Sequence, residues 1–216
     1  MAAAPAKTRV VLADDHLIFN EALKQVLDKA GLEVVATVSD GRAAVEAVRR
    51  LAPDVVVLDV AMPLLNGVDA AREITSVDPH PHVILLSGLD DARFVPGALQ
   101  AGVRGFVLKS QGTDDLLRAI TEVLHGALYV SPAASQAVID ACAPGGRVEE
   151  RDSLTPRERQ VAQLVAQGKS NKEIAHVLHI AVKTAEFHRG RLMHKLHLRD
   201  VPALVRYAIR EGLIAP

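Results

Sequence analysis

The sequence lacks residue types on which several classes of protein depend. Tryptophan is absent, aromatic residues make up 3%, and there is one cysteine in 216 residues. A single cysteine excludes an internal disulfide framework, and we interpret Cys142, close to Pro144-Gly145-Gly146, as an inert thiol in a linker. With so few aromatic side chains, the hydrophobic cores must be built from alanine, valine, leucine and isoleucine.

Long apolar segments are also missing. The sequence contains no run of 18 apolar residues, which argues against a membrane-spanning helix. The first seven residues are too short and too weakly apolar to resemble a secretory signal. Together with the single cysteine, these features predict a protein of the reducing cytoplasm.

The net charge of -1 hides an uneven distribution along the chain. From Arg151 onward, 12 lysines and arginines face 6 aspartates and glutamates, a balance of +6, whereas the residues before it hold 13 against 20, a balance of -7. This asymmetry favours different partners for the two parts, with a polyanion as the partner of the basic part.

Alternating strand and helix patterns run through residues 7–125. Apolar runs typical of buried parallel strands are separated by amphipathic segments, such as residues 17–30 and 42–51. The five predicted strands are residues 9–13, 33–37, 54–58, 82–87 and 105–108. Five strand–helix units predict an α/β domain with a doubly wound, five-stranded parallel sheet.

The pattern changes after residue 125. Residues 126–152 lack useful periodicity and predict a linker, in which Ser131-Pro132 opens a short helix. Residues 153–216 show only helical signals, including capping boxes that begin at Thr155 and Ser170. We therefore expect a small all-α domain with helices at residues 156–167, 171–178, 182–196 and 201–211.

Polar residues end four of the predicted strands at one shared edge of the sheet. Asp14 and Asp15 follow the first strand, Asp59 follows the third, Ser87 ends the fourth and Lys109 follows the fifth. Ligands of doubly wound sheets bind beyond the carboxyl ends of the strands. Converging carboxylates need a cation, for which Mg²⁺ is suited, while a lysine and a hydroxyl suit a phosphoryl group. A lone aspartate at a strand end is more often a helix cap or turn residue, but four matching strand ends favour a common pocket.

The segments around these positions resemble the receiver domain of two-component response regulators. They are residues 10–16 (VVLADDH), 59–67 (DVAMPLLNG) and 105–109 (GFVLK). The resemblance implies a flavodoxin-like fold in which Asp59 accepts a phosphoryl group from a histidine kinase. The Mg²⁺ ligands that it implies are Asp14, Asp15, Asp59 and the backbone carbonyl of Ala61. Its supporting residues would be Lys109 and Ser87, which contact the phosphoryl group, and Phe106, the coupled aromatic switch.

A phosphatase with an aspartate nucleophile is the enzymatic alternative. Such enzymes carry a second aspartate two residues after the nucleophile, as the general acid and base. The corresponding position here is Ala61, which cannot carry a proton. We therefore expect a protein that is not an enzyme.

The predicted fourth helix of the first domain contains Pro96-Gly97. Inside a helix, proline costs about 3 kcal/mol and glycine about 1 kcal/mol relative to alanine. We expect this helix to be short, kinked or to begin near Pro96; alternatively, Pro96 simply lies in its first turn.

The basic part resembles a LuxR-type (NarL/FixJ) helix-turn-helix domain from Leu154 to about Ala208. The similar segments are residues 154–161 (LTPRERQV) and 168–175 (GKSNKEIA), followed by Thr184, His188, Lys195 and Leu196. The resemblance implies that the helix beginning at Val182 enters the major groove of double-stranded DNA. The residues that it places at bases are Glu186, Phe187 and Gly190. The expected phosphate contacts are Lys172, Lys183, Thr184, Arg189, Arg191 and Lys195, with His188 either packed or facing a phosphate.

Two positions depart from the pattern of this family. Ala181 stands where a serine N-cap is usual, a loss that costs roughly 1 kcal/mol. Gly190 lies within the recognition helix and adds a penalty of about 1 kcal/mol. We therefore expect weaker or more dimer-dependent DNA binding than in typical relatives.

The two halves together predict a transcriptional response regulator that is switched by phosphorylation of Asp59. Its expected partners are a cognate histidine kinase, double-stranded DNA and, when phosphorylated, a second copy of the chain. The alternative is a DNA-binding regulator whose receiver is not phosphorylated and responds to another input.

Overall fold

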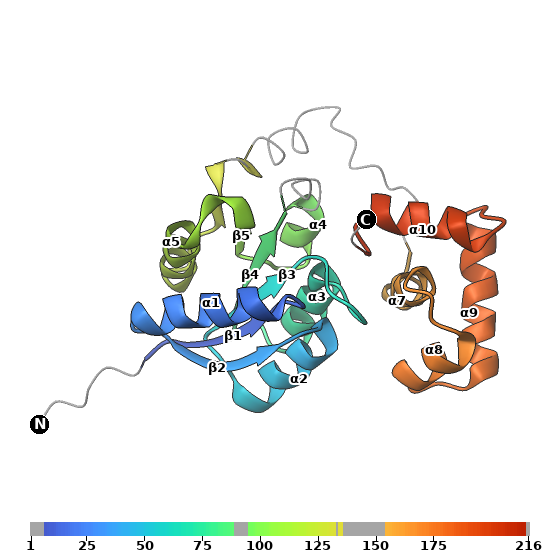
Figure 1. Cartoon of the computed structure of the whole chain (residues 1–216), viewed down its shortest axis with the longest axis horizontal. Coiled ribbons are helices and arrows are strands. Elements are labelled where there is room, and N and C mark those ends of the chain that lie inside the picture. Colours follow the sequence, from blue (N-terminus) through green and yellow to red (C-terminus); the bar gives the residue numbers. More distant parts are fainter. Residues whose placement is uncertain (1–6, 89–94, 133, 136–153, 215–216) are drawn as a thin grey trace, which may run out of the picture.

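The computed structural model describes residues 7–88, 95–132, 134–135 and 154–214, which form two lobes (Figure 1). The first lobe is an α/β domain and the second is all helical. Among the described residues, no helix is both long and apolar enough to cross a bilayer.

A parallel sheet forms the centre of the first lobe, with strand order β2-β1-β3-β4-β5-β6. The strands are β1 (Arg9–Ala13), β2 (Glu33–Val38), β3 (Val55–Asp59), β4 (His82–Ser87), β5 (Gly105–Leu108) and β6 (Tyr129–Val130). The prediction of a doubly wound parallel sheet is confirmed. The predicted number of five strands is wrong, because Tyr129 and Val130 pair in parallel with Gly105 and Phe106. Two residues are too few to show an alternating or apolar pattern in the sequence.

Helices cover both faces of the sheet. They are α1 (Leu17–Lys29), α2 (Gly41–Leu51), α3 (Gly67–Val77), α4 (Val95–Gln100) and α5 (Thr113–Leu124). Alternate residues of the strands point to opposite faces. Val10 and Val57, for example, belong to a core with α1 and α5, whereas Val11 and Val56 belong to a core with α2, α3 and α4.

Helix α4 is short in the described part of the chain. It begins at Val95, so Pro96 lies in its first turn, where a missing backbone N–H costs nothing. Residues 89–94, part of the segment predicted for this helix, lie outside the described residues. The same holds for much of the predicted linker: Pro132, Ala134 and Ser135 are helical, and residues 136–152 are not described.

Four helices form the second lobe. They are α7 (Pro156–Ala166), α8 (Asn171–Val177), α9 (Val182–Lys195) and α10 (Val201–Arg210), each one residue shorter than predicted because the last predicted residue is the C-cap. Both predicted capping boxes are confirmed, at Thr155 and Ser170. Ala181 is the N-cap of α9 and makes no side-chain cap, as expected, while the weaker DNA binding predicted from it stays a prediction. Leu164, Ile174, Leu192 and Leu204, one from each helix, meet in a single core.

Candidate functional site

The carboxyl edge of the sheet holds two buried aspartates. Asp59 is the last residue of β3, and its exposed fraction is 4%. Asp14 directly follows β1, the strand beside β3, and its exposed fraction is 2%. Because adjacent parallel strands end at this edge, the fold itself brings the two carboxylates together.

Lys109 joins these two carboxylates. Its Nζ lies 2.6 Å from Asp14 Oδ2 and 2.8 Å from Asp59 Oδ1. Burial alone would lower the pKa of Lys109, but Asp59 and Asp14 together hold it above 10.5. The same ammonium group lies 5.0 Å from the centre of the Phe19 ring. Lys109 is therefore charged and held at the position where a cation is needed.

The ionised form of Asp59 remains costly despite this partner. The pKa of Asp59 is raised to about 6, mainly by burial and to a smaller degree by the negative charges of Asp14 and Asp15, against the lowering effect of Lys109. The effect of burial on the pKa of Asp59 thus outweighs that of the Lys109 ammonium group at 2.8 Å. A carboxylate in this state gains more from an added cation than an exposed one does.

Asp15 and His16 complete the acidic pocket. One ligand atom each of Asp14, Asp15, His16 and Asp59 lie within 4.8 Å of one another. The imidazole Nδ1 of His16 is 3.0 Å from Asp14 Oδ1 and 2.9 Å from Asp15 Oδ1. Three carboxylates with open access from solvent at Asp15 are a donor set that fits a hard divalent cation.

Sequence reasoning missed two residues of this pocket. His16 follows the two aspartates directly, so its position was a signal that it could contact them. Asn20 gave no such signal: it lies one turn into α1, and its Nδ2 donates a 2.6 Å hydrogen bond to the backbone carbonyl of Asp14. This bond fixes the end of β1 and hence the direction of the Asp14 carboxylate.

The other predicted receiver residues surround the same edge. Ser87 is fully buried, and its hydroxyl donates to the Gly88 carbonyl at 3.3 Å, a long bond that can be exchanged for a better acceptor. Phe106 is 1% exposed and packs inside the core that α2, α3 and α4 share. Ala61 lies two residues beyond Asp59, in the loop between β3 and α3.

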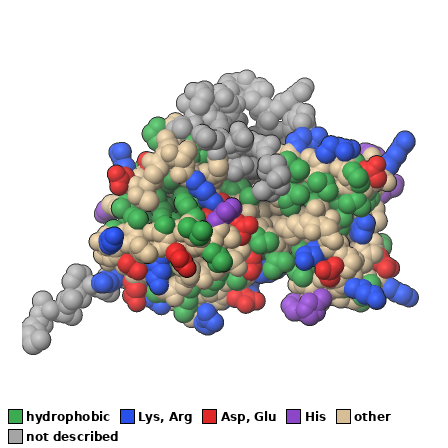
Figure 2. Space-filling view, in the orientation of Figure 1, with side chains coloured by type: hydrophobic (Ala, Val, Ile, Leu, Met, Phe, Trp, Pro, Cys, Tyr) green, Lys and Arg blue, Asp and Glu red, His purple; other side chains and the backbone are tan. Residues whose placement is uncertain are grey.

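The second predicted site is the outer surface of α9. Phe187 is 63% exposed, which is unusual for a large apolar side chain without a ligand. The neighbouring predicted DNA contacts Lys183, Thr184, Glu186, Gly190 and Arg191 are also exposed, and His188 is partly buried. Figure 2 shows lysine and arginine side chains around the outer margin of this lobe.

Three of the predicted phosphate contacts already have partners within the lobe, and one of them is Arg191, whose Nε lies 3.7 Å from Glu158 Oε1. Lys195 Nζ lies 2.7 Å from Glu158 Oε2, and Arg189 donates to Asn171 Oδ1 at 3.2 Å. Lys172 and Lys183 are exposed on α8 and α9. The exposed pair therefore has more freedom to reach phosphates than Lys195 and Arg189 have.

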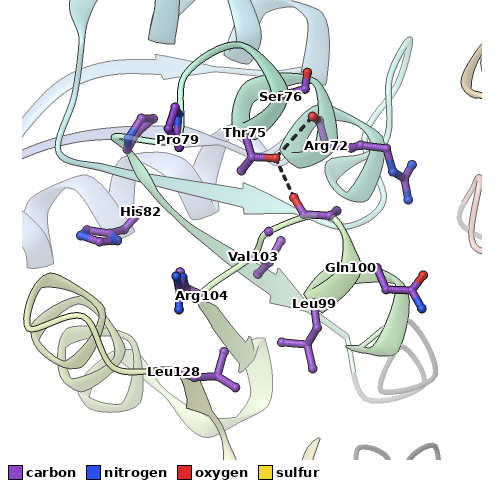
Figure 3. A pocket seen from close by; sticks show the side chains of 13 residues that line it. Arg72, Thr75, Ser76, Pro79, His82, Leu99, Gln100, Val103, Arg104 and Leu128 are labelled. Atoms are coloured by element: carbon purple, nitrogen blue, oxygen red, sulfur yellow. Dashed lines mark hydrogen bonds between the residues drawn. The ribbon is translucent and has the colours of Figure 1, made fainter.

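A cavity of about 730 Å³ lies at the opposite, amino edge of the sheet (Figure 3). The Thr75 hydroxyl faces it but is already bonded to the carbonyls of Ala71 and Ala101. The Arg72 side chain points away from the centre of the cavity, and Arg72 pairs with Asp69. These polar groups do not converge on one point, so the acidic pocket remains the better candidate site.

Comparisons with known proteins agree with this geometry. Residues 10–121 match the response regulator receiver domain family, and residues 152–208 match the family of bacterial regulatory proteins called the luxR family. The chain is 37% identical over 211 residues to the transcriptional regulatory protein MctR of Rhizobium johnstonii, covering 97% of this chain and 96% of MctR. The chain belongs to the LuxR-type response regulators.

Two further relatives of this response regulator match it over nearly the whole length of both chains. It is 32% identical to the oxygen regulatory protein NreC of Staphylococcus epidermidis over 95% of this chain and 99% of NreC. It is also similar to RcsB of Salmonella enterica serovar Typhimurium, in a structure bound to a promoter with the phosphomimetic BeF3⁻. That likeness has a TM-score of 0.62 and 26% identity, over 94% of this chain and 98% of RcsB. The response regulator is thus a DNA-binding transcription regulator of two-component signalling and not an enzyme, with a histidine kinase and DNA as partners.

Proposed function

We propose that Asp59 is the phosphoryl acceptor of this response regulator. The proposal rests on one observation. At one edge of the sheet, the carboxylates of Asp14 and Asp59 both lie within 2.8 Å of the ammonium group of Lys109. An oxygen of Asp59 attacks the phosphorus of a phosphohistidine that is protonated on its other ring nitrogen. The P–N bond breaks as a P–O bond forms, its electron pair stays on the nitrogen, and the imidazole leaves in its neutral form. Lys109 then balances the charge that the phosphoryl oxygens bring.

Magnesium is the cofactor that this pocket would hold. Its ligands would be the carboxylates of Asp14, Asp15 and Asp59 and the backbone carbonyl of Ala61, an all-oxygen set that suits Mg²⁺. When bound, Mg²⁺ neutralises charge on the phosphoryl group during transfer. Ser87 would donate its hydroxyl to the phosphoryl group, and Phe106 would respond to that movement inside the core.

The phosphorylated receiver would control DNA binding by the second lobe. Glu186 and Phe187 are proposed to read bases in the major groove, and Lys172 and Lys183 are proposed to contact phosphates. A phosphorylated protein that binds DNA in the reducing cytoplasm as a two-fold dimer fits this arrangement. RcsB, seen on promoter DNA with a phosphomimetic, supports this proposal by analogy.

Labelling with radioactive acetyl phosphate tests the acceptor. The wild type should take up label only with Mg²⁺, and Asp59→Asn should take up none. Asp78→Asn is the matched control, because Asp78 is exposed and its carboxylate accepts from the His80 N–H at 2.9 Å, away from the pocket. Equal labelling of Asp59→Asn and the wild type would reject Asp59 as the acceptor, and a wild type that takes up no label would favour the alternative, a receiver that responds to another input.

A further inference from the structure

The two lobes are joined by a glutamine that is completely buried. Gln163 of α7 has an exposed fraction of 0%, and its side chain enters the loop between β3 and α3 of the receiver. Its Nε2 donates to the Met62 carbonyl at 2.6 Å, and its Oε1 accepts from the Asn66 N–H at 3.1 Å. One side chain of the helical lobe thus satisfies two backbone groups of one receiver loop.

Two further contacts lie on either side of Gln163. Leu64, at the tip of the loop, packs against the core of the helical lobe. Its φ of +64° is in the left-handed region, which a leucine adopts only when its surroundings hold it there. Nε of Arg159 lies 3.5 Å from Oδ1 of Asp69, in the first turn of α3.

The loop between β3 and α3 is continuous with the phosphorylation pocket. It begins after Asp59 and passes through Ala61, the proposed source of a backbone ligand for Mg²⁺, one residue before Met62. Both ends of the loop are fixed. The Gly67 N–H donates to the Val60 carbonyl at 2.9 Å, and a Cβ on Gly67 would lie 2.1 Å from the Asp59 carbonyl oxygen. A reorientation of the Ala61–Met62 peptide therefore cannot be absorbed at the ends and must move residues 62–66.

We propose that Gln163 couples the metal and phosphoryl site to the position of the DNA-binding lobe. In the docked state, Gln163 holds the Met62 carbonyl in place. Binding of Mg²⁺ at the Ala61 carbonyl would turn the Ala61–Met62 peptide, so docking and metal binding oppose each other. This inference rests on the proposed function, because it assigns the proposed Mg²⁺ ligands a second effect. Coupling between two sites is reciprocal, so release of the lobe must strengthen metal binding.

Docking restricts the lobe without covering its DNA-reading surface. The receiver contacts α7, whereas α9 lies on the far side of the lobe (Figure 1). Phe187 is 63% exposed and the Arg191 side chain is 66% exposed in this docked state. The contact therefore fixes where the recognition helix can be placed, which governs how two lobes align on paired half-sites.

A pair of like charges opposes the docking of the two lobes. The positive charge of Arg42, in the first turn of α2, acts on Arg157 of α7 and, after burial, lowers the pKa of Arg157. Two like charges across the lobes oppose the docking that Gln163, Leu64 and Arg159 favour. A small change in the loop can then shift the balance between docked and released states.

Magnesium titration of the full chain tests this coupling without any phosphoryl donor. Gln163→Ala should bind Mg²⁺ about fivefold more tightly than the wild type by calorimetry, at the low end of typical coupling between sites. Hydrogen exchange of the Asn66 amide, followed by NMR, should be faster in Gln163→Ala, and faster in the wild type with Mg²⁺ than without. Gln167→Ala is the matched control, since Gln167 is the C-cap of the same helix, one turn beyond Gln163, and it should leave both quantities unchanged.

Arg159→Ala provides a second variant if Gln163→Ala does not fold, because the Arg159 side chain is 31% exposed. It should shift both quantities in the same direction. Wild-type Mg²⁺ affinity in the folded variant, or an Asn66 amide as protected as in the wild type, would overturn the coupling. Failure of Asp59 labelling with intact coupling would instead overturn only the proposed acceptor.

Discussion

The ammonium group of Lys109, which follows β5, lies 2.8 Å from Oδ1 of Asp59 at the end of β3, two strands that are separated in the sheet by β4. The same group is 2.6 Å from Asp14, so one lysine neutralises part of the charge of two buried carboxylates. Even so, burial raises the pKa of Asp59 to about 6. The pocket thus keeps an excess of negative charge that a divalent cation can relieve.

The raised pKa of Asp59 makes the stability of the metal-free receiver depend on pH. A carboxyl group whose pKa rises from 3.8 to about 6 on folding destabilises the fold as pH rises through this window, and its cost is constant above it. Asp59→Asn removes the ionisation. In buffer with a chelator at pH 7.5, we expect its free energy of unfolding to exceed that of the wild type by about 2–3 kcal/mol.

Denaturant unfolding at several pH values measures this difference. The advantage of Asp59→Asn should shrink as the pH falls from 7 to 4, because the wild-type carboxyl becomes protonated in the same window. Saturating Mg²⁺ should reduce the difference at pH 7.5, since the wild type offers the ion one carboxylate more than Asp59→Asn does. A difference that is independent of pH would contradict the assigned cause.

The missing N-cap of α9 predicts a stabilising substitution. Ala181→Ser places a hydroxyl where it can accept from the free N–H groups of the first turn, which should stabilise the helical lobe by about 1 kcal/mol. Gly190→Ala should add a similar amount, about 1 kcal/mol, because a Cβ at Gly190 meets nothing within 4 Å. Thermal unfolding of the full chain measures both effects. A lower transition temperature in either variant would show that the stability of α9 is not set by its local helix propensity.

Glu158 of α7 holds the recognition helix, α9, through ion pairs. It is 3% exposed, accepts from Lys195 at 2.7 Å and lies 3.7 Å from Arg191, and the hydrogen bond from Lys195 is the main cause that lowers its pKa. Its contribution is therefore present above pH 4.5 and is lost as the pH falls through the lowered pKa. Glu158→Gln should cost about 1–2 kcal/mol at pH 7, discounted because Lys195 is partly exposed.

The pH dependence separates this anchor from simple packing. The cost of Glu158→Gln, measured by denaturant unfolding, should decrease between pH 5 and pH 3. Glu186→Gln is a suitable control, since Glu186 is exposed on the same helix that Glu158 supports. A cost that stays constant over this range would mean that shape, and not charge, holds α9 in place.

Salt dependence distinguishes phosphate contacts from base contacts on the recognition helix. Lys183→Ala should reduce the slope of log affinity against log salt concentration by about 0.9, the value for one phosphate. Phe187→Ala should leave the slope unchanged but alter the preference among DNA sequences, because an apolar ring contacts bases and not phosphates. Fluorescence anisotropy with labelled DNA measures both, and Lys24→Ala in α1 of the receiver is the control for Lys183→Ala.

Much of the acidic pocket could be predicted because the end of a buried strand can be recognised in the local sequence, as a polar residue after an apolar run. The apolar runs that precede Asp14, Asp59 and Lys109 are strong signals, and a parallel sheet brings their ends together. The helical caps at Thr155 and Ser170 were equally local, so the helix limits were predicted to within one residue.

Features that depend on contacts between distant residues could not be predicted. β6 is two residues long and exists because β5 offers an open edge to Tyr129 and Val130. Gln163 reads as one polar residue of an amphipathic helix, yet it is fully buried because its partners come from a loop 97 residues away. A residue's own sequence neighbourhood carries no signal for such a partner.

Control of DNA binding by phosphorylation is tested most directly by the DNA affinity of one preparation before and after phosphorylation. DNA fragments are first selected from genomic DNA by binding to the protein, and affinities are then measured with and without acetyl phosphate and Mg²⁺. We expect the phosphodonor to raise the affinity of the wild type and to leave that of Asp59→Asn unchanged. An equal response of both proteins, or no response of a fully labelled wild type, would contradict it.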